Sequence, residues 1–168
     1  MLETHPFGDF VPTKTKYLMI GSFVSKPSNP YEWFYANGRN QFWPIMEAVY
    51  NNSFPTKEKQ QELFIDLKMA LTDIIYSCER KSNSNLDINL FNITYNIKGI
   101  NSIIAEKQIE KIYLTSKYVE KMFKKQFKET IHARPEIAII TIPSSSPRYA
   151  MMTKQEKIQR YKELLPTL

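Results

Sequence analysis

An apolar run from Tyr17 to Ile20 ends abruptly at Gly21, and this short segment constrains the fold more than any other part of the sequence. A run of this kind that stops at a glycine is typical of a strand buried on both faces. Open α/β sheets bind their ligands at the carboxyl ends of such strands. We therefore expect the residues that follow Gly21 to carry the chemistry of the protein.

Three further segments have the composition of buried strands. They are rich in β-branched and other apolar residues, and they span residues 71–78, 109–115 and 137–142. Between them the apolar residues follow a helical period, which predicts helices over residues 42–49, 56–68, 92–106, 116–127 and 153–165. Thr153 and Glu156 form a capping-box pattern at the start of the last helix.

This alternation of strands and helices predicts a parallel sheet covered on both faces, because parallel strands need crossover connections. All strand carboxyl ends then lie along one edge of the sheet. Three loops should converge at that edge, and they span residues 21–40, 78–85 and 143–149.

Length and charge set the broad class of the protein. Its 168 residues fit a single domain, 1–168, in which residues 1–16 form a lead-in segment. Lys and Arg number 23 against 17 acidic residues, and the net charge of +6 permits an anionic partner. The single cysteine, Cys78, excludes an internal disulfide or a cysteine-rich metal site built by this chain alone. With no signal-peptide pattern and no apolar run near the roughly 20 residues of a membrane span, we expect a cytoplasmic monomer without a membrane partner.

Aromatic and amide side chains gather in the stretch that follows the first strand. Within 34–46 the sequence combines four aromatic rings, the amides of two asparagines and one guanidinium: Phe34, Tyr35, Phe42, Trp43, Asn37, Asn40 and Arg39. This mixture suits a planar ligand with polar edges, such as a nucleobase. For Trp43 we favour a position in the core.

Four motifs together resemble the uracil-DNA glycosylase superfamily, and within it the hypoxanthine-DNA glycosylase branch most of all. The most specific motif is the Tyr-Ala-x-x-Arg-Asn-x-Phe-Trp pattern that begins at Tyr35. The others are Ile-Gly-Ser-Phe at residues 20–23 with Pro-Ser at 27–28, the segment 73–80, and Ile142 followed by Pro-Ser-Ser-Ser-Pro. The resemblance covers the chain from about residue 17 to the final helix.

Such a resemblance implies an α/β fold, a three-layer αβα sandwich around a four-stranded parallel sheet. It also implies a DNA glycosylase of base excision repair. Such an enzyme hydrolyses the N-glycosidic bond of a deaminated base, hypoxanthine or uracil, that has been flipped out of damaged DNA. Neither a metal nor a cofactor would be needed. No buried lysine is evident beside the motifs, so we expect a monofunctional enzyme.

The resemblance gives Asn40 the role of orienting the attacking water. Most branches of the superfamily hold this water with an Asp or Asn just after the first-strand glycine, but here Ser22 and Phe23 follow Gly21. The hypoxanthine branch also lacks that residue and is thought to use the asparagine of its Arg-Asn pair, which is Asn40. As an alternative, Asn40 caps the helix that follows it.

The serine loop after the last strand resembles the second motif of the superfamily, where a histidine often donates to the charged base oxygen. Ile142 stands in that position, so donors to the leaving base would be backbone N–H groups or hydroxyls such as Ser144. We assign catalysis to Asn40 and Ser144, and base binding to Gly21, Ser22, Phe23, Tyr35 and Phe42. DNA contacts are assigned to Lys26, Pro27, Ser28, Arg39, Pro143, Ser145, Ser146 and Arg148.

Two other functions compete with the enzyme. A catalytically inactive nucleic-acid-binding module on the same fold would explain the missing acid after Gly21 and the missing histidine at Ile142. It would also explain why Asn37 and Gly38 take the place of the family's usual His-Pro pair. A small-molecule hydrolase that uses the serine loop would need a nearby histidine, but we expect both histidines, at positions 5 and 132, to lie away from the strand ends.

Overall fold

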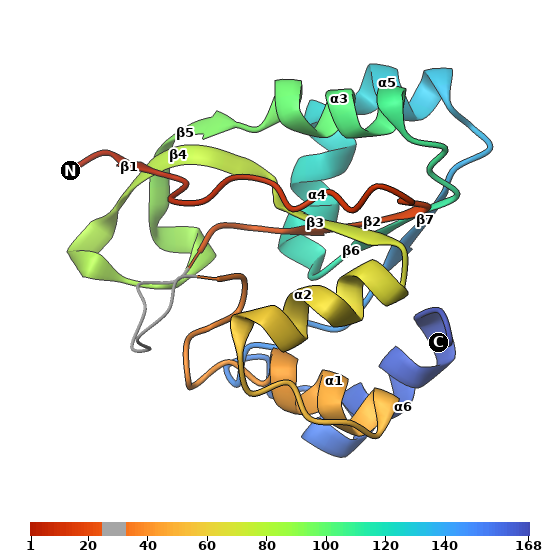
Figure 1. Cartoon of the computed structure of the whole chain (residues 1–168). Helices are drawn as coiled ribbons and strands as arrows, with labels where there is room; N and C mark the ends of the chain where they lie inside the picture. The colour runs from red at the N-terminus through yellow and green to blue at the C-terminus, as the bar shows by residue number, and fades with distance from the viewer. Residues whose placement is uncertain (25–32) are drawn as a thin grey trace.

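Four parallel strands form the central sheet, as predicted (Figure 1). They occur in the spatial order β3-β2-β6-β7, and their bounds are Tyr17–Gly21 for β2, Met69–Asp73 for β3, Lys111–Leu114 for β6 and Ala138–Thr141 for β7. This computed structural model describes residues 1–24 and 33–168. The register places Gly21 beside Asp73, so both residues lie at the carboxyl edge of the sheet.

Helices cover both faces of this sheet and complete the three-layer αβα sandwich (Figure 1). One layer contains α1 (Phe42–Tyr50), α2 (Lys57–Asp66) and α6 (Lys154–Leu164). The other contains α3 (Ile97–Glu106), α4 (Lys117–Gln126) and α5 (Lys128–Ala133). None of the helices in the described part of the chain is long and apolar enough to cross a membrane.

The alternation of side chains along β2 divides the core between the two layers. Met19 packs into the cluster that contains Phe42 and Tyr161, whereas Leu18 and Ile20 pack into the cluster on the opposite face. All three β2 side chains have an exposed fraction of 0%. Burying a side chain of this size stabilises the fold by about 1.5–3 kcal/mol. The first strand therefore anchors both layers at once.

Side-chain caps fix the starts of three helices. The hydroxyl oxygens of Thr56 and Ser116 accept hydrogen bonds from the first turns of α2 and α4. The predicted capping box at α6 is confirmed, because Thr153 accepts from the Glu156 N–H and the Glu156 carboxylate accepts from the Thr153 N–H. Each of these helices therefore begins at a position that the sequence specifies locally.

A second, antiparallel sheet corrects two of the predicted elements. It has the order β1-β4-β5 and contains β1 (Glu3–Thr4), β4 (Ile75–Arg80) and β5 (Leu90–Tyr95). The single strand predicted over residues 71–78 is thus two strands that belong to different sheets. The helix predicted over residues 92–106 is β5 followed by α3. Apolar and polar residues alternate from Phe91 to Tyr95, which is the period of a strand.

The lead-in segment is ordered and lies along the edge of the sheet next to β3. Strand β1 pairs with β4, and the backbone groups of Phe10 and Leu71 exchange two hydrogen bonds of 2.9 Å. Further along, the Lys16 N–H donates to the Lys68 carbonyl (2.8 Å). These contacts bring the first residues of the chain close to the carboxyl edge of the sheet.

Replacing the capping threonine of α6 tests the local basis of this fold. We expect Thr153→Ala to lower the free energy of unfolding by about 1 kcal/mol, because a backbone N–H of the first turn loses its acceptor. Urea unfolding followed by circular dichroism measures this change. Thr167→Ala is the matched control, since Thr167 is exposed and lies beyond the helix. Equal effects of the two substitutions would contradict the capping role.

Candidate active site

A pocket of about 580 Å³ opens at the carboxyl ends of all four parallel strands. Each strand contributes a lining residue at or just after its carboxyl end. These residues are Ser22 after β2, Asp73 at the end of β3, Thr115 after β6 and Ser144 after β7. Two of the three loops predicted to converge there are confirmed in this place. The third loop, residues 78–85, is confirmed only at its end, since Asn85 is its one residue that lines the pocket.

Tyr35 and Asp73 line the pocket and approach Gly21 closely, whereas Gly21 itself is not among the lining residues. If Gly21 carried a Cβ atom, that atom would lie 2.5 Å from Asp73 Oδ1 and 2.7 Å from the Tyr35 hydroxyl oxygen. Real Cβ atoms do not tolerate such distances. The glycine at the end of β2 is therefore required so that a carboxylate and a phenol can both reach the strand end.

Tyr35 is held in a strained backbone conformation with its hydroxyl inside the protein. Its φ angle is 58°, in the left-handed region, and its ring stacks on Phe42 with a centroid distance of 4.0 Å. Burial raises the pKa of Tyr35 well above its ordinary value, the Asp73 charge adds to this effect and Thr115 opposes it. Among the described residues the Tyr35 hydroxyl has no hydrogen-bond partner of ordinary geometry. It is therefore a buried, protonated donor without a described acceptor.

Phe42 does not occupy the position expected of a base-stacking residue. Its exposed fraction is 0%, it does not line the pocket, and its ring supports Tyr35 from behind. Helix α1 begins at Phe42, so the ring belongs to the apolar face that the helix buries. Phe23, the other predicted candidate, is half-buried and lines the pocket. Trp43 lies in the core, as predicted, and its Nε1–H donates to the Phe34 carbonyl (2.9 Å).

The Arg80 side chain fixes Phe23 and its surroundings. Its guanidinium lies 5.2 Å from the Phe23 ring centroid, donates to Glu3 (2.8 Å), and donates to the Val24 carbonyl. Additional hydrogen bonds of 3.2 Å reach Ser84 and Asn85. With a side-chain exposure of 4%, Arg80 connects β1, β4 and the end of β2 and holds them together beside the pocket.

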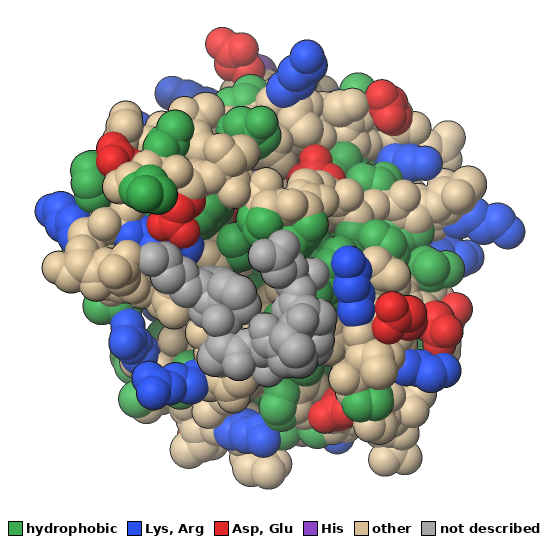
Figure 2. All heavy atoms as spheres, turned by 60° about the vertical axis from the view of Figure 1, so that its left-hand side comes forward, with side chains coloured by type: hydrophobic (Ala, Val, Ile, Leu, Met, Phe, Trp, Pro, Cys, Tyr) green, Lys and Arg blue, Asp and Glu red, His purple; other side chains and the backbone are tan. Residues whose placement is uncertain are grey.

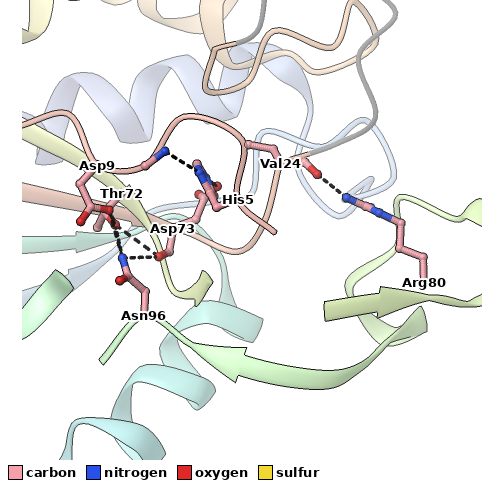
Figure 3. Close-up of polar contacts among 8 residues, drawn as sticks. His5, Asp9, Val24, Thr72, Asp73, Arg80 and Asn96 are labelled. Atoms are coloured by element: carbon pink, nitrogen blue, oxygen red, sulfur yellow. Dashed lines mark hydrogen bonds and ion pairs between the residues drawn. The ribbon is translucent and has the colours of Figure 1, made fainter. Parts of the chain in front are cut away.

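His5 lies against the strand end, contrary to the sequence-based expectation. Its Nε2 atom is 2.8 Å from Asp73 Oδ2, and both side chains are almost fully buried (Figure 3). The Gly8 backbone N–H donates to His5 Nδ1 (3.1 Å), so Nδ1 carries no proton. The proton in the contact with Asp73 is therefore on Nε2, so the imidazole donates to the Asp73 carboxylate.

A second group of polar contacts holds the same lead-in segment next to β3 (Figure 3). Thr72 Oγ1 donates to an Asp9 carboxylate oxygen, and Asn96 Nδ2 donates to both of these residues at 3.0 Å. None of these three side chains lines the pocket. Asp9 thus attaches the segment to the sheet, whereas His5 extends from it toward the pocket wall.

Asp87 brings a second carboxylate to the pocket, from the 3-10 turn η2 (Asp87–Asn89). Burial raises the pKa of its carboxyl group, and the nearby Asp73 charge acts in the same direction. A hydrogen bond with Ser22 and the positive charge of Arg80 oppose this rise. Asp87 also lines a more open hollow next to the pocket, so it lies nearer to the rim than Asp73 does.

Asn40 lines the pocket and joins the two main motifs. Its Oδ1 accepts the Phe42 backbone N–H (2.9 Å) and the Ser145 hydroxyl (2.8 Å). Only an oxygen can face the Phe42 N–H, so the orientation of the amide is fixed. The alternative that Asn40 caps the helix is wrong, because the N-cap residue of α1 is Gln41 and Asn40 lies one residue before it. Both acceptor positions of Oδ1 are occupied, while neither contact uses the two Nδ2 hydrogens.

The serine loop is held rigidly by its own hydroxyls and by α1. Ser144 Oγ accepts the Ser146 N–H (3.2 Å), Ser146 Oγ accepts the Arg148 N–H (3.3 Å), and the Gln41 N–H donates to the Ser145 carbonyl (2.9 Å). Ser145 is buried but is among the residues that line the pocket, and its hydroxyl donates to Asn40 Oδ1 in another motif. Ser144 and Ser146 line the pocket. Pro143 is not among the lining residues.

Helix α6 supports this loop from below with a buried lysine. Lys157 has an exposed fraction of 1%, and its Nζ donates to Gln41 Oε1 (3.1 Å) and to the Ser146 carbonyl (3.0 Å). Tyr161 donates to the Pro143 carbonyl (2.7 Å). The expectation that no buried lysine accompanies the motifs is therefore wrong. Lys157 does not line the pocket, however, and its ammonium is engaged by the loop that it supports.

Cations are available at the mouth of the pocket. Arg39 and Arg148 are exposed and line it. Lys26, Pro27 and Ser28 fall outside the described residues. On the face shown in Figure 2, Lys and Arg side chains occur together with Asp and Glu, so the visible charge is mixed. Within 1–24 and 33–168 no cluster of three His, Cys, Asp or Glu side chains could hold a metal ion.

The central sheet and its two helix layers define a three-layer αβα sandwich with a pocket at the carboxyl ends of its parallel strands. A solved structure with this fold is a protein from Methanosarcina acetivorans described as a "putative Uracil DNA glycosylase". It superposes with a TM-score of 0.71 at 17% sequence identity, over 98% of this chain and 99% of that chain. No family model and no curated protein matches the sequence. The structural likeness establishes the fold.

Sequence reasoning did not identify His5 and Asp73 as part of the site. Asp73 lies inside an apolar run that was interpreted as one strand, although it is the residue paired with Gly21. A carboxylate within such a run is itself a signal, because burying a charge is costly without a partner. His5 carries no comparable signal, since its approach depends on how the lead-in segment packs.

Two tyrosines allow a test of the unpartnered hydroxyl. We expect Tyr35→Phe to change the free energy of unfolding by less than about 0.5 kcal/mol, because no protein group loses a hydrogen bond. Tyr161→Phe is the matched control and should cost about 1–3 kcal/mol, because it leaves the partly buried Pro143 carbonyl without its donor. Chemical denaturation measures both. A loss for Tyr35→Phe as large as the control's would show that its hydroxyl has a structural partner.

Proposed function

We propose that the protein is a DNA glycosylase that hydrolyses the N-glycosidic bond of a deaminated base, hypoxanthine or uracil, in damaged DNA. The observation that carries this proposal is the composition of the pocket at the carboxyl ends of the four parallel strands. There an aromatic ring, a buried phenol, an amide, hydroxyls and carboxylates surround one space. The likeness in fold to the Methanosarcina acetivorans protein supports the same function.

The pocket suits a base that has been flipped out of the DNA stack. A volume of about 580 Å³ is enough for a nucleobase and part of its sugar. Enzymes that flip bases hold them by stacking and by hydrogen bonds to the base edge. Phe23 supplies an apolar face, and the Tyr35 hydroxyl and Asn40 Nδ2 supply donors. Arg39 and Arg148 at the mouth would contact the phosphates that flank the flipped nucleotide.

Cleavage of the glycosidic bond places negative charge on the departing base and positive charge on the sugar. Donors that reach the base oxygens would stabilise the first charge, and Tyr35 and Ser144 are the candidates for this role. Asn40 would orient the attacking water by donating from Nδ2 to the water oxygen. This assignment needs no metal and no cofactor.

The occupied Asn40 oxygen also favours a second candidate function. Because Oδ1 already accepts two hydrogen bonds, it cannot take a proton from water. If no other residue did so, the protein would bind a flipped base without cleaving it. The second candidate is therefore a catalytically inactive nucleic-acid-binding module on the same fold.

An oligonucleotide panel distinguishes the two candidates. Duplexes with hypoxanthine, uracil, xanthine or mismatched thymine are incubated with the protein, and abasic sites are revealed by hot alkali. We expect the wild-type protein to excise at least one deaminated base. Asn40→Ala should reduce the single-turnover rate by about 100-fold, because a preorganised donor is lost.

The control for this substitution is Asn52→Ala, which changes an exposed asparagine just beyond α1. It should leave the rate unchanged. Binding of the lesion duplexes by wild type without excision of any base would favour the binding module over the enzyme. Full activity of Asn40→Ala would leave the enzyme class in place and remove the assigned role of Asn40.

Borohydride trapping tests whether the enzyme is monofunctional. A lyase activity would require an amine that forms a Schiff base with the abasic sugar. Lys157 is engaged by Gln41 and Ser146, so we expect no covalent adduct with lesion DNA in the presence of borohydride. Gel electrophoresis under denaturing conditions detects such an adduct. An adduct that disappears in Lys157→Met would contradict this expectation.

A further inference from the structure

Two carboxylates line the pocket within the described residues, and they are held in different ways. Asp87 lies near the rim on a short 3-10 turn. Asp73 ends a strand of the central sheet, and its side chain has an exposed fraction of 4%. A general base must be held in a fixed position relative to the attacking water. A strand of the central sheet holds Asp73 more rigidly than the short turn holds Asp87.

The two oxygens of Asp73 have separate environments. Oδ2 accepts from His5, whereas Oδ1 faces the Cα atom of Gly21 and receives no hydrogen bond from any residue the structure describes. A buried carboxylate oxygen with no donor is costly unless something else reaches it. Asp73 lines the pocket, and Oδ1 is the oxygen that has no donor among the described residues.

His5 fixes the orientation of this carboxylate. Its Nδ1 accepts the Gly8 N–H, which leaves the Nε2 proton for Asp73. The imidazole ring is itself held edge-on by Phe7 and Phe23, at centroid distances of 4.7 and 5.9 Å. The carboxylate therefore cannot rotate freely, and Oδ1 stays directed to the end of β2.

We propose that Asp73 is the general base of the glycosylase reaction and that His5 is the positioning residue that aims it, a proposal that rests on the function proposed above. The site is built from a strand end and the lead-in segment, and it takes the place of the acid or amide that is missing after Gly21. In this proposal Asn40 and Asp73 act on the same water molecule. Asn40 donates a hydrogen bond to the water oxygen, and Asp73 accepts a proton from the water.

The step balances as a hydrolysis. The bond between the sugar C1′ and the base nitrogen breaks, and its electron pair leaves with the base. The water oxygen forms a bond to C1′ as one water proton passes to Asp73 Oδ1. That proton is then released to the departing base, so Asp73 returns to its ionised form. The products are an abasic sugar with a hydroxyl at C1′ and the free base.

Single-turnover rates of full-length variants on the best substrate of the panel test the proposal. Asp73→Asn retains the shape and the hydrogen bond to His5 but is not a base, and we expect its rate to fall by about 100-fold or more. Its affinity for the lesion duplex should change by less than about threefold. Asp9→Asn is the matched control, because it perturbs the attachment of the same lead-in segment outside the pocket. Its rate should stay within about threefold of wild type.

Chemical rescue separates a base from a structural carboxylate. Added formate should restore part of the rate of Asp73→Ala, because a small carboxylate can occupy the space left beside Gly21. Formate should not restore the rate of Asn40→Ala. A structural role for Asp73 predicts no rescue in either variant.

His5 is tested by a conservative pair. His5→Ala should lower the single-turnover rate by about tenfold with duplex affinity retained, and His5→Gln should recover part of this loss, because its amide can donate to Asp73. Thermal melting confirms that each variant is folded. Equal rates for His5→Ala and His5→Gln would exclude the positioning role.

The outcomes distinguish this proposal from the function on which it rests. If wild type excises no base, the proposed function fails, and the general base fails with it. If wild type is active and folded Asp73→Asn keeps its rate within about threefold, the function stands and Asp73 is not the base. A loss in Asp87→Asn with full activity in Asp73→Asn would move the role to Asp87.

Discussion

The pairing of β2 with β3 is the constraint on which the site depends. Because the two strands are parallel and in register, Gly21 and Asp73 end side by side at the same edge. The glycine has no side chain, so the carboxylate can approach the strand end to a distance that any other residue would prevent. The Tyr35 hydroxyl also lies close to this glycine, and the Tyr35 backbone is left-handed. One backbone register thus brings an acid and a phenol to one point.

Much of the architecture follows from the sequence alone because each signal is local. The buried run before Gly21, the β-branched run before Pro143 and the capping box at Thr153 each specify their own element. The predictions failed where the decisive interaction is between distant segments. The chain turns from one sheet into another after Asp73, and an apolar run does not reveal such a change of partner.

In the site, too, local motifs were predictable from the sequence, whereas contacts between distant segments were not. Asn40 and the serine loop were predicted from motifs, and they contact each other directly. Phe42 was assigned to the ligand because motif and composition cannot tell which face of an aromatic ring a helix will bury. The position of His5 in the lead-in segment, 12 residues before β2, gives no sign that it lies at a strand end. The lead-in segment packs along β3, and this packing alone brings the imidazole to the pocket.

Support for the pocket comes from both ends of the chain. His5 reaches Asp73 across a separation of 68 residues, and Lys157 reaches Gln41 across 116. Contacts between such distant residues form slowly, because loop closure must precede them. During synthesis the motif around Asn40 is made early, whereas the serine loop that it contacts follows 105 residues later. Competence for chemistry is a property that appears late, when the final helix docks.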